Sequence, residues 1–165
     1  MLFSINLCEI ISNNYISFVF SKTVDLVSSL KKQGHSVTVL MTQSATEFIQ
    51  PLTLQVLSQN TVHLDVMQEP FPDQVNHIQI GKETDLFIVV PATANTIAKL
   101  AHGFADNMVT ATALALPHFV PKLLAPAMNT KMYDHPATQA NPQQLDRQAG
   151  GITNTVTLHS SEAPT

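Results

Sequence analysis

The sequence contains a single cysteine, Cys8, and no tryptophan. One thiol excludes an internal disulfide framework and a metal site built from several cysteines, so we expect a reducing, cytoplasmic setting. Eight Lys and Arg stand against twelve Asp and Glu, which gives a net charge of −4, and no basic run occurs. A nucleic acid or an anionic membrane surface is therefore not an expected partner.

Long apolar runs are also missing, since none approaches the roughly 20 residues of a membrane span. The apolar stretch 1–11 is interrupted by Asn6 and Glu9 and has no Lys or Arg before it. No small-residue cleavage site is clear there, so we expect no secretory signal. With 44% hydrophobic and 12% charged residues, 165 residues suffice for one domain with a buried core, here residues 1–165.

Glycine is scarce, and the first of the five is Gly34. The sequence has no G-x-S-x-G elbow, P-loop or G-x-G-x-x-G, which removes the commonest hydrolase, nucleoside-triphosphate and NAD interpretations. None of the seven histidines has metal-ligand spacing and no thiolates cluster with them, so we expect no metal site.

Short β-branched runs alternate with helical periodicity along most of the chain. This alternation predicts an α/β fold, a doubly wound parallel sheet of flavodoxin- or Rossmann-like three-layer type. Residues 12–21 are compatible with a strand and turn, and periodicity fades after Leu145. The expected strands are 36–40, 86–90, which Pro91 ends, and 122–125. One expected helix begins at Lys22 and stops at Gly34, and another begins at a cap at Thr42. The other expected helices are 51–57, 77–82, one that follows 93–96, and 108–116.

Three polar segments follow these strands, and ligands of open α/β sheets bind at the carboxyl ends of strands. Thr42 and Ser44 suit a phosphate, or form an ordinary helix cap. Residues 93–96 combine small side chains with hydrogen-bonding ones, which suits a flat ring, or a capped turn. Asn129 lies in a methionine-rich loop and is either a specific hydrogen-bond partner or structural. The residues concerned are Thr42, Ser44, Thr93, Ala94, Asn95, Thr96, Ala127 and Asn129.

His77 follows a proline-rich loop and begins a helix just before the strand 86–90. A histidine that faces the same edge as these segments can relay protons near neutral pH. The alternative is a solvated helix start.

Together these features resemble the flavoprotein decarboxylases that act on a cysteine carboxylate, which include phosphopantothenoylcysteine decarboxylases and lantibiotic peptide decarboxylases. The family motifs stand here as PATANT (91–96), PAMNTKMY (126–133) and His77-Ile78, and the likeness runs from about Lys22 to Ala140. The stretches 22–48 and 51–63 also look like the family.

The resemblance implies FMN as cofactor, with Thr42 and Ser44 on its phosphate side and with residues 93–96 and Ala127 along its ring. It implies that His77 is the catalytic base and that Asn129 binds the substrate carboxylate. The expected substrate is a small cysteine-containing molecule, 4'-phosphopantothenoylcysteine, converted to 4'-phosphopantetheine in coenzyme A biosynthesis. The family also implies a homotrimer or a dodecamer of trimers, with the site at a subunit interface.

The chain departs from the family pattern at both ends. Alignment through Lys22 puts Ile16 at the position of a phosphate-loop glycine, which predicts weaker FMN binding. Nothing after Ala140 matches the family's A-C-G-D clamp, whose cysteine donates a proton, so the product is then expected to stop at the enethiol. These departures leave two alternatives open, a non-catalytic or regulatory subunit and a peptidyl-cysteine decarboxylase.

Overall fold

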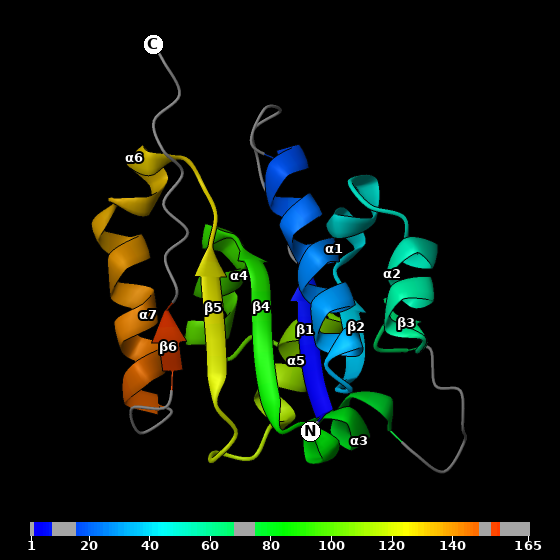
Figure 1. Ribbon diagram of the computed structural model, residues 1–165. Helices are drawn as coiled ribbons and strands as arrows, with labels where there is room; N and C mark the ends of the chain where they lie inside the picture. The colour runs from blue at the N-terminus through cyan, green and yellow to red at the C-terminus, as the bar shows by residue number, and fades with distance from the viewer. Residues whose placement is uncertain (1, 8–15, 68–74, 149–152, 156–165) are drawn as a thin grey trace.

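The computed structural model describes residues 2–7, 16–67, 75–148 and 153–155, and these residues form a parallel sheet with helices on both faces (Figure 1). The strand order is β3-β2-β1-β4-β5-β6, and every pair of neighbours is parallel. The order reverses between β1 and β4, as in doubly wound folds, which confirms the predicted class. The strands are β1 (Leu2–Leu7), β2 (Ser36–Met41), β3 (Val62–His63), β4 (Leu86–Ala92), β5 (Lys122–Pro126) and β6 (Thr153–Thr155).

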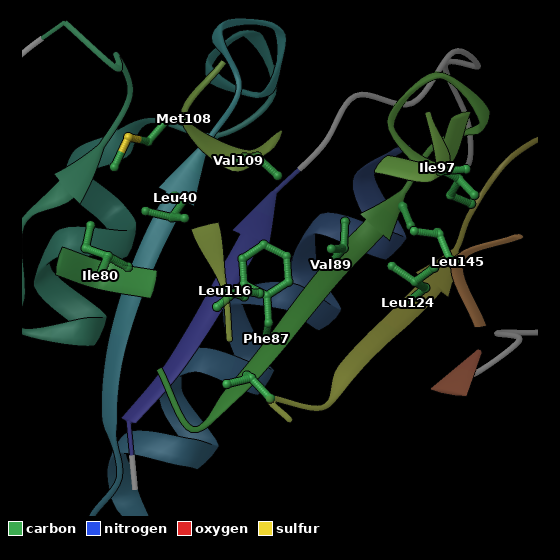
Figure 2. Close-up of a cluster of buried hydrophobic side chains, with 13 residues drawn as sticks. Leu40, Ile80, Phe87, Val89, Ile97, Met108, Val109, Leu116, Leu124 and Leu145 are labelled. Atoms are coloured by element: carbon green, nitrogen blue, oxygen red, sulfur yellow. The ribbon is translucent and has the colours of Figure 1, made fainter. Parts of the chain in front are cut away.

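Two buried clusters, one on each face of the sheet, define the three layers. One cluster joins the sheet to α1 (Ile16–Lys32), the short 3-10 helix η1 (Gln43–Glu47) and α2 (Pro51–Ser58). The other cluster, shown in Figure 2, joins it to the helices of the opposite face. Those helices are α3 (Asn76–Glu83), α4 (Ala94–Ala101), α5 (Met108–Ala115) and α7 (Pro136–Gln148), and the one-turn α6 (Thr130–Tyr133) follows β5.

Strand β4 is central and apolar on both sides, as its sequence predicts. Phe87 and Val89 pack into the α4–α5 face, whereas Ile88 and Val90 pack into the α1–α2 face. The strand does not end at Pro91 as expected, because it continues to Ala92, which pairs with Pro126. The register shifts between Val89 and Ala92, and an irregular position of this kind accommodates a proline without loss of a ladder hydrogen bond.

Helix α1 corrects the expectation of a strand and turn over 12–21, because residues 16–21 are helical and 12–15 lie outside the described residues. Thr23 and Val27 are fully buried one turn apart, so the helix is fixed by packing on the sheet. Its predicted stop is confirmed: Gly34 has φ +84° and its N–H donates to the Lys31 carbonyl at 3.0 Å. Glycine takes this left-handed conformation at little cost.

Three strands were not anticipated, namely β1 and the two edge strands β3 and β6, of two and three residues. Helix α7 continues to Gln148, past Leu145 where the periodicity fades, and contains Pro142. Leu145 is the residue that anchors it in the core. Within the described residues, no helix has the length and apolar character needed to cross a membrane.

Candidate active site at the carboxyl edge of the sheet

The segments after β4 and β5 meet at the carboxyl edge, as the sequence predicts. The backbone N–H of Ala127 donates to the carbonyl of Ala92 at 3.0 Å, which ties the two segments together beyond the last paired residues. Strand β2 ends at the same edge, because Met41 pairs with Leu7 and β1 lies between β2 and β4. The edge therefore flanks the β1–β4 reversal of strand order, where doubly wound folds bind ligands.

The segment after β2 begins with Thr42, which caps η1. Its Oγ1 accepts a hydrogen bond from the Ala45 N–H at 3.3 Å, so the predicted cap is confirmed, on a 3-10 helix. The capping hydroxyl keeps its own O–H as a donor. Ser44 is half-buried beside it. The hydroxyl groups of Thr42 and Ser44 can therefore donate hydrogen bonds to an anionic group at the carboxyl edge.

The segment after β4 turns its two threonines inward. Thr93 Oγ1 accepts from the Thr96 N–H at 3.2 Å and lies 3.5 Å from Thr96 Oγ1, and both side chains are buried. These threonines therefore shape the turn into α4, whereas Asn95 is exposed and Ala94 is half-buried. The outward surface of the turn consists of one small side chain and one amide, on which a flat ring can lie.

The segment after β5 presents Asn129. Its Oδ1 accepts from the Lys131 N–H at 2.9 Å and caps α6, which fixes the side-chain plane. Asn129 is exposed, and the amide nitrogen, which the cap does not use, has two N–H donors. An oriented amide donor of this kind suits a carboxylate, and Lys131 adds the only charge among residues 42–45, 93–96 and 127–131.

His77 lies in the first turn of α3, and the contact between Asn76 and His63 ties that turn to the end of β3. Asn129 follows β5, and strands β2, β1 and β4 lie between β3 and β5 in the sheet. Gly81 packs against the carboxyl end of α5, since a Cβ built there would lie 3.2 Å from the Ala115 carbonyl oxygen. The expected juxtaposition of His77 with Asn129 stays a prediction.

The start of α3 contains a polar pair that the sequence alone did not reveal. Asn76 Nδ2 lies 2.8 Å from His63 Nδ1, which joins the start of α3 to the end of β3. Burial lowers the pKa of His63 from its ordinary value of 6.5. His77 is half-exposed, but its Nδ1 is buried and has no hydrogen-bond partner among the described residues. A buried polar atom of this kind calls for a hydrogen-bond partner beyond those residues.

No three His, Cys, Asp or Glu side chains lie close enough to hold a metal ion in the part of the chain that the structure describes. Apart from Lys131, the segments 42–45, 93–96 and 127–131 of the carboxyl edge contain only neutral side chains. Cys8 and the segment between β1 and α1 lie outside the described residues.

Curated relatives match most of the chain. It is 60% identical over 120 residues to a "probable phosphopantothenoylcysteine decarboxylase" of Streptococcus mutans, covering 73% of this chain and 67% of that protein. It is 48% identical over 120 residues to the coenzyme A biosynthesis bifunctional protein CoaBC of Bacillus subtilis, covering 73% of this chain. The chain matches only 29% of the length of that bifunctional relative.

A solved structure has the same fold. The crystal structure of the FMN-dependent cysteine decarboxylase SpaF superposes with a TM-score of 0.76 at 26% identity, covering 93% of this chain and 82% of that one. The family model described as Flavoprotein matches residues 16–162. The chain thus belongs to the Flavoprotein family.

Proposed function

We propose that this protein catalyses the FMN-dependent decarboxylation of 4'-phosphopantothenoylcysteine, a step of coenzyme A biosynthesis, in the cytoplasm. The observation that carries the proposal is the hydrogen bond from the Ala127 N–H to the Ala92 carbonyl, which joins the PATANT and PAMNTKMY segments at one edge. The 60% identity to the streptococcal relative supports the choice of substrate.

The residues at the carboxyl edge fit FMN. Ala92 is fully buried, and Ala94 and Ala127 are half-buried, so no bulky side chain from these three positions blocks a planar ring. Asn95 supplies hydrogen bonds to ring heteroatoms. Thr42 and Ser44 supply hydroxyl donors for the phosphate side. Ile16 stands at the expected glycine position as the first residue of α1, and its φ is not positive, so it fits there without left-handed strain.

Bound FMN would supply the two-electron oxidation of the substrate thiol to a thiocarbonyl, and that thiocarbonyl would be the electron sink for loss of carbon dioxide. The chain's own residues position and deprotonate the substrate. Asn129 donates its amide N–H groups to the carboxylate that is lost, while its Oδ1 remains on the Lys131 N–H. The His77 imidazole accepts the thiol proton.

We further propose that a second copy of the chain completes the site. The first turn of α3, with His77, is tied to β3, whereas Asn129 follows β5, and three strands at about 4.8 Å spacing lie between them, so we infer that the two residues act on one substrate across an interface. Exposed apolar side chains occur on α2 and beside His77: Leu52 and Val56 on α2 are 65% and 66% exposed, and Val75 and Ile78 are 46% and 39% exposed. Such residues are typical of surfaces that become buried on association.

The absorbance spectrum of the freshly purified protein is the first test, and we expect flavin bands, either directly or after addition of FMN. We expect carbon dioxide release from 4'-phosphopantothenoylcysteine and none from a peptide that ends in cysteine. The His77→Asn variant is the matched control, expected to retain the flavin spectrum and to lose carbon dioxide release. A protein that remains colourless after incubation with FMN contradicts the proposal. Release from the peptide alone reassigns the substrate.

A further inference from the structure

A cavity of about 130 Å³ lies apart from the carboxyl edge, between the sheet and helices α4, α5 and α7. Its wall is apolar and includes Phe87, Leu100, Leu116, Leu124 and Leu145. Figure 2 shows four of these side chains, those of Phe87, Leu116, Leu124 and Leu145, in the cluster on one face of the sheet. A cavity of about 150 Å³ with a comparable lining accepts benzene, so this one has room for a small hydrocarbon group.

The cavity is open to solvent. Phe104 and Leu114, which also line it, are 56% and 62% exposed and flank its mouth. Gly103 in the same wall has φ +69° and no atom within 4 Å of the position of a Cβ, so the wall is not closed at that point. A small molecule can therefore enter without unfolding of the surrounding helices.

One cation lines this apolar space. Lys122 begins β5 and is half-buried, and burial lowers the pKa of its ammonium group. Asp106, close to the mouth in sequence, is already paired with Lys99. No carboxylate pairs with Lys122 among the described residues. The other titratable residue of the lining is His118. An unpaired ammonium in apolar surroundings is costly, and an anion that entered beside it would lower that cost.

We propose that this cavity binds a small apolar monocarboxylate, with its hydrocarbon part among the leucines and its carboxylate on Lys122 Nζ. The apolar wall selects the hydrocarbon, and the single cation selects one negative charge rather than a phosphate with two. The site is independent of the decarboxylation proposed above, because it shares no residue with the carboxyl edge.

Ligand-observed NMR on the full-length protein tests this, with benzoate as probe and benzamide as its neutral counterpart. We expect saturable binding of benzoate that is tighter than that of benzamide. Lys122→Met should weaken benzoate about tenfold, the loss of a charge-assisted hydrogen bond, and should leave benzamide unchanged. Lys82→Met, at an exposed lysine on α3, is the matched control and should leave both affinities unchanged.

A second variant, Ala113→Leu, adds bulk to the cavity wall without touching the cation and should abolish the binding of both probes. It also keeps the test decisive if Lys122→Met does not fold. No saturable binding of benzoate to the wild-type protein overturns the proposal. Binding that survives Ala113→Leu, or that does not distinguish benzoate from benzamide, also overturns it. Carbon dioxide release is not a readout here, so failure of this site leaves the proposed decarboxylation standing.

Discussion

Mixing two inactive variants should restore decarboxylation if each site is shared between two copies of the chain. His77→Asn removes the proposed base on α3, and Asn129→Asp replaces the proposed amide donor at the carboxyl edge. Because three strands separate β3, which contacts the start of α3, from β5, which Asn129 follows, we expect each shared site to take His77 from one copy and Asn129 from another.

The expected magnitude follows from this geometry. In assemblies formed at random from equal amounts of the two variants, half of the contributed histidines and half of the contributed asparagines are intact. About one quarter of the sites then contain both, so activity should recover to about one quarter of the wild-type value. Each variant alone should release almost no carbon dioxide.

The assay is carbon dioxide release after the two variants are unfolded together and refolded, or coexpressed with different tags and purified through both. The control is a mixture of the same two variants that were folded separately and not exchanged, which should stay inactive. Recovery of no activity in mixed assemblies, when their composition is confirmed by mass, refutes the shared site. Full activity of either variant alone refutes the assigned role of that residue.

Other predictions concern single positions. Asn129→Asp keeps an oxygen that accepts the Lys131 N–H, so the melting temperature of this variant should match the wild type while its rate of decarboxylation falls at least tenfold. Asn129→Ala should lose activity and also about 1 kcal/mol of stability, because the cap is removed. Equal melting of all three proteins contradicts the capping role. Gly81→Val should cost about 1–3 kcal/mol in urea unfolding, because its Cβ would crowd the Ala115 carbonyl oxygen at 3.2 Å; unchanged stability would show that α3 can shift from α5. Burial lowers the pKa of His63 below 6.5, so the unfolded chain takes up a proton first as pH falls and the free energy of unfolding decreases below about pH 6.5. His63→Gln should reduce that decrease between pH 7.5 and 5.5, and an identical pH dependence of the variant would contradict the assignment.

Local sequence was sufficient for the central elements. The run LFIVV is apolar at every position, so only a strand covered on both faces satisfies it, and β4 is that strand. The sequence predicts a cap at Thr42 and offers a capped turn as one of two interpretations of residues 93–96, and Thr42 and Thr93 each accept a backbone N–H as a cap does. Gly34 ends α1 because a left-handed residue is required there.

The edge strands of the sheet could not be predicted from local sequence. Strands β3 and β6 have two and three residues, too few for any periodicity, and they exist because a neighbouring strand offers backbone partners. The residues at the start of α1 favour a strand, because they include Phe18, Val19 and Phe20, but this segment is helical. Intrinsic preference is a weak guide where long-range packing decides.

The sequence by itself determined the chemistry of the carboxyl edge, because the residue types that follow each buried strand are local facts and parallel strands must end together. Only the tertiary structure decided where the histidine helix lies. His77 begins α3, whose first turn contacts β3, whereas Asn129 follows β5 on the other side of β2, β1 and β4. The sequence could not reveal this placement, since it depends on the strand order and on how the crossover between β3 and β4 packs against α5.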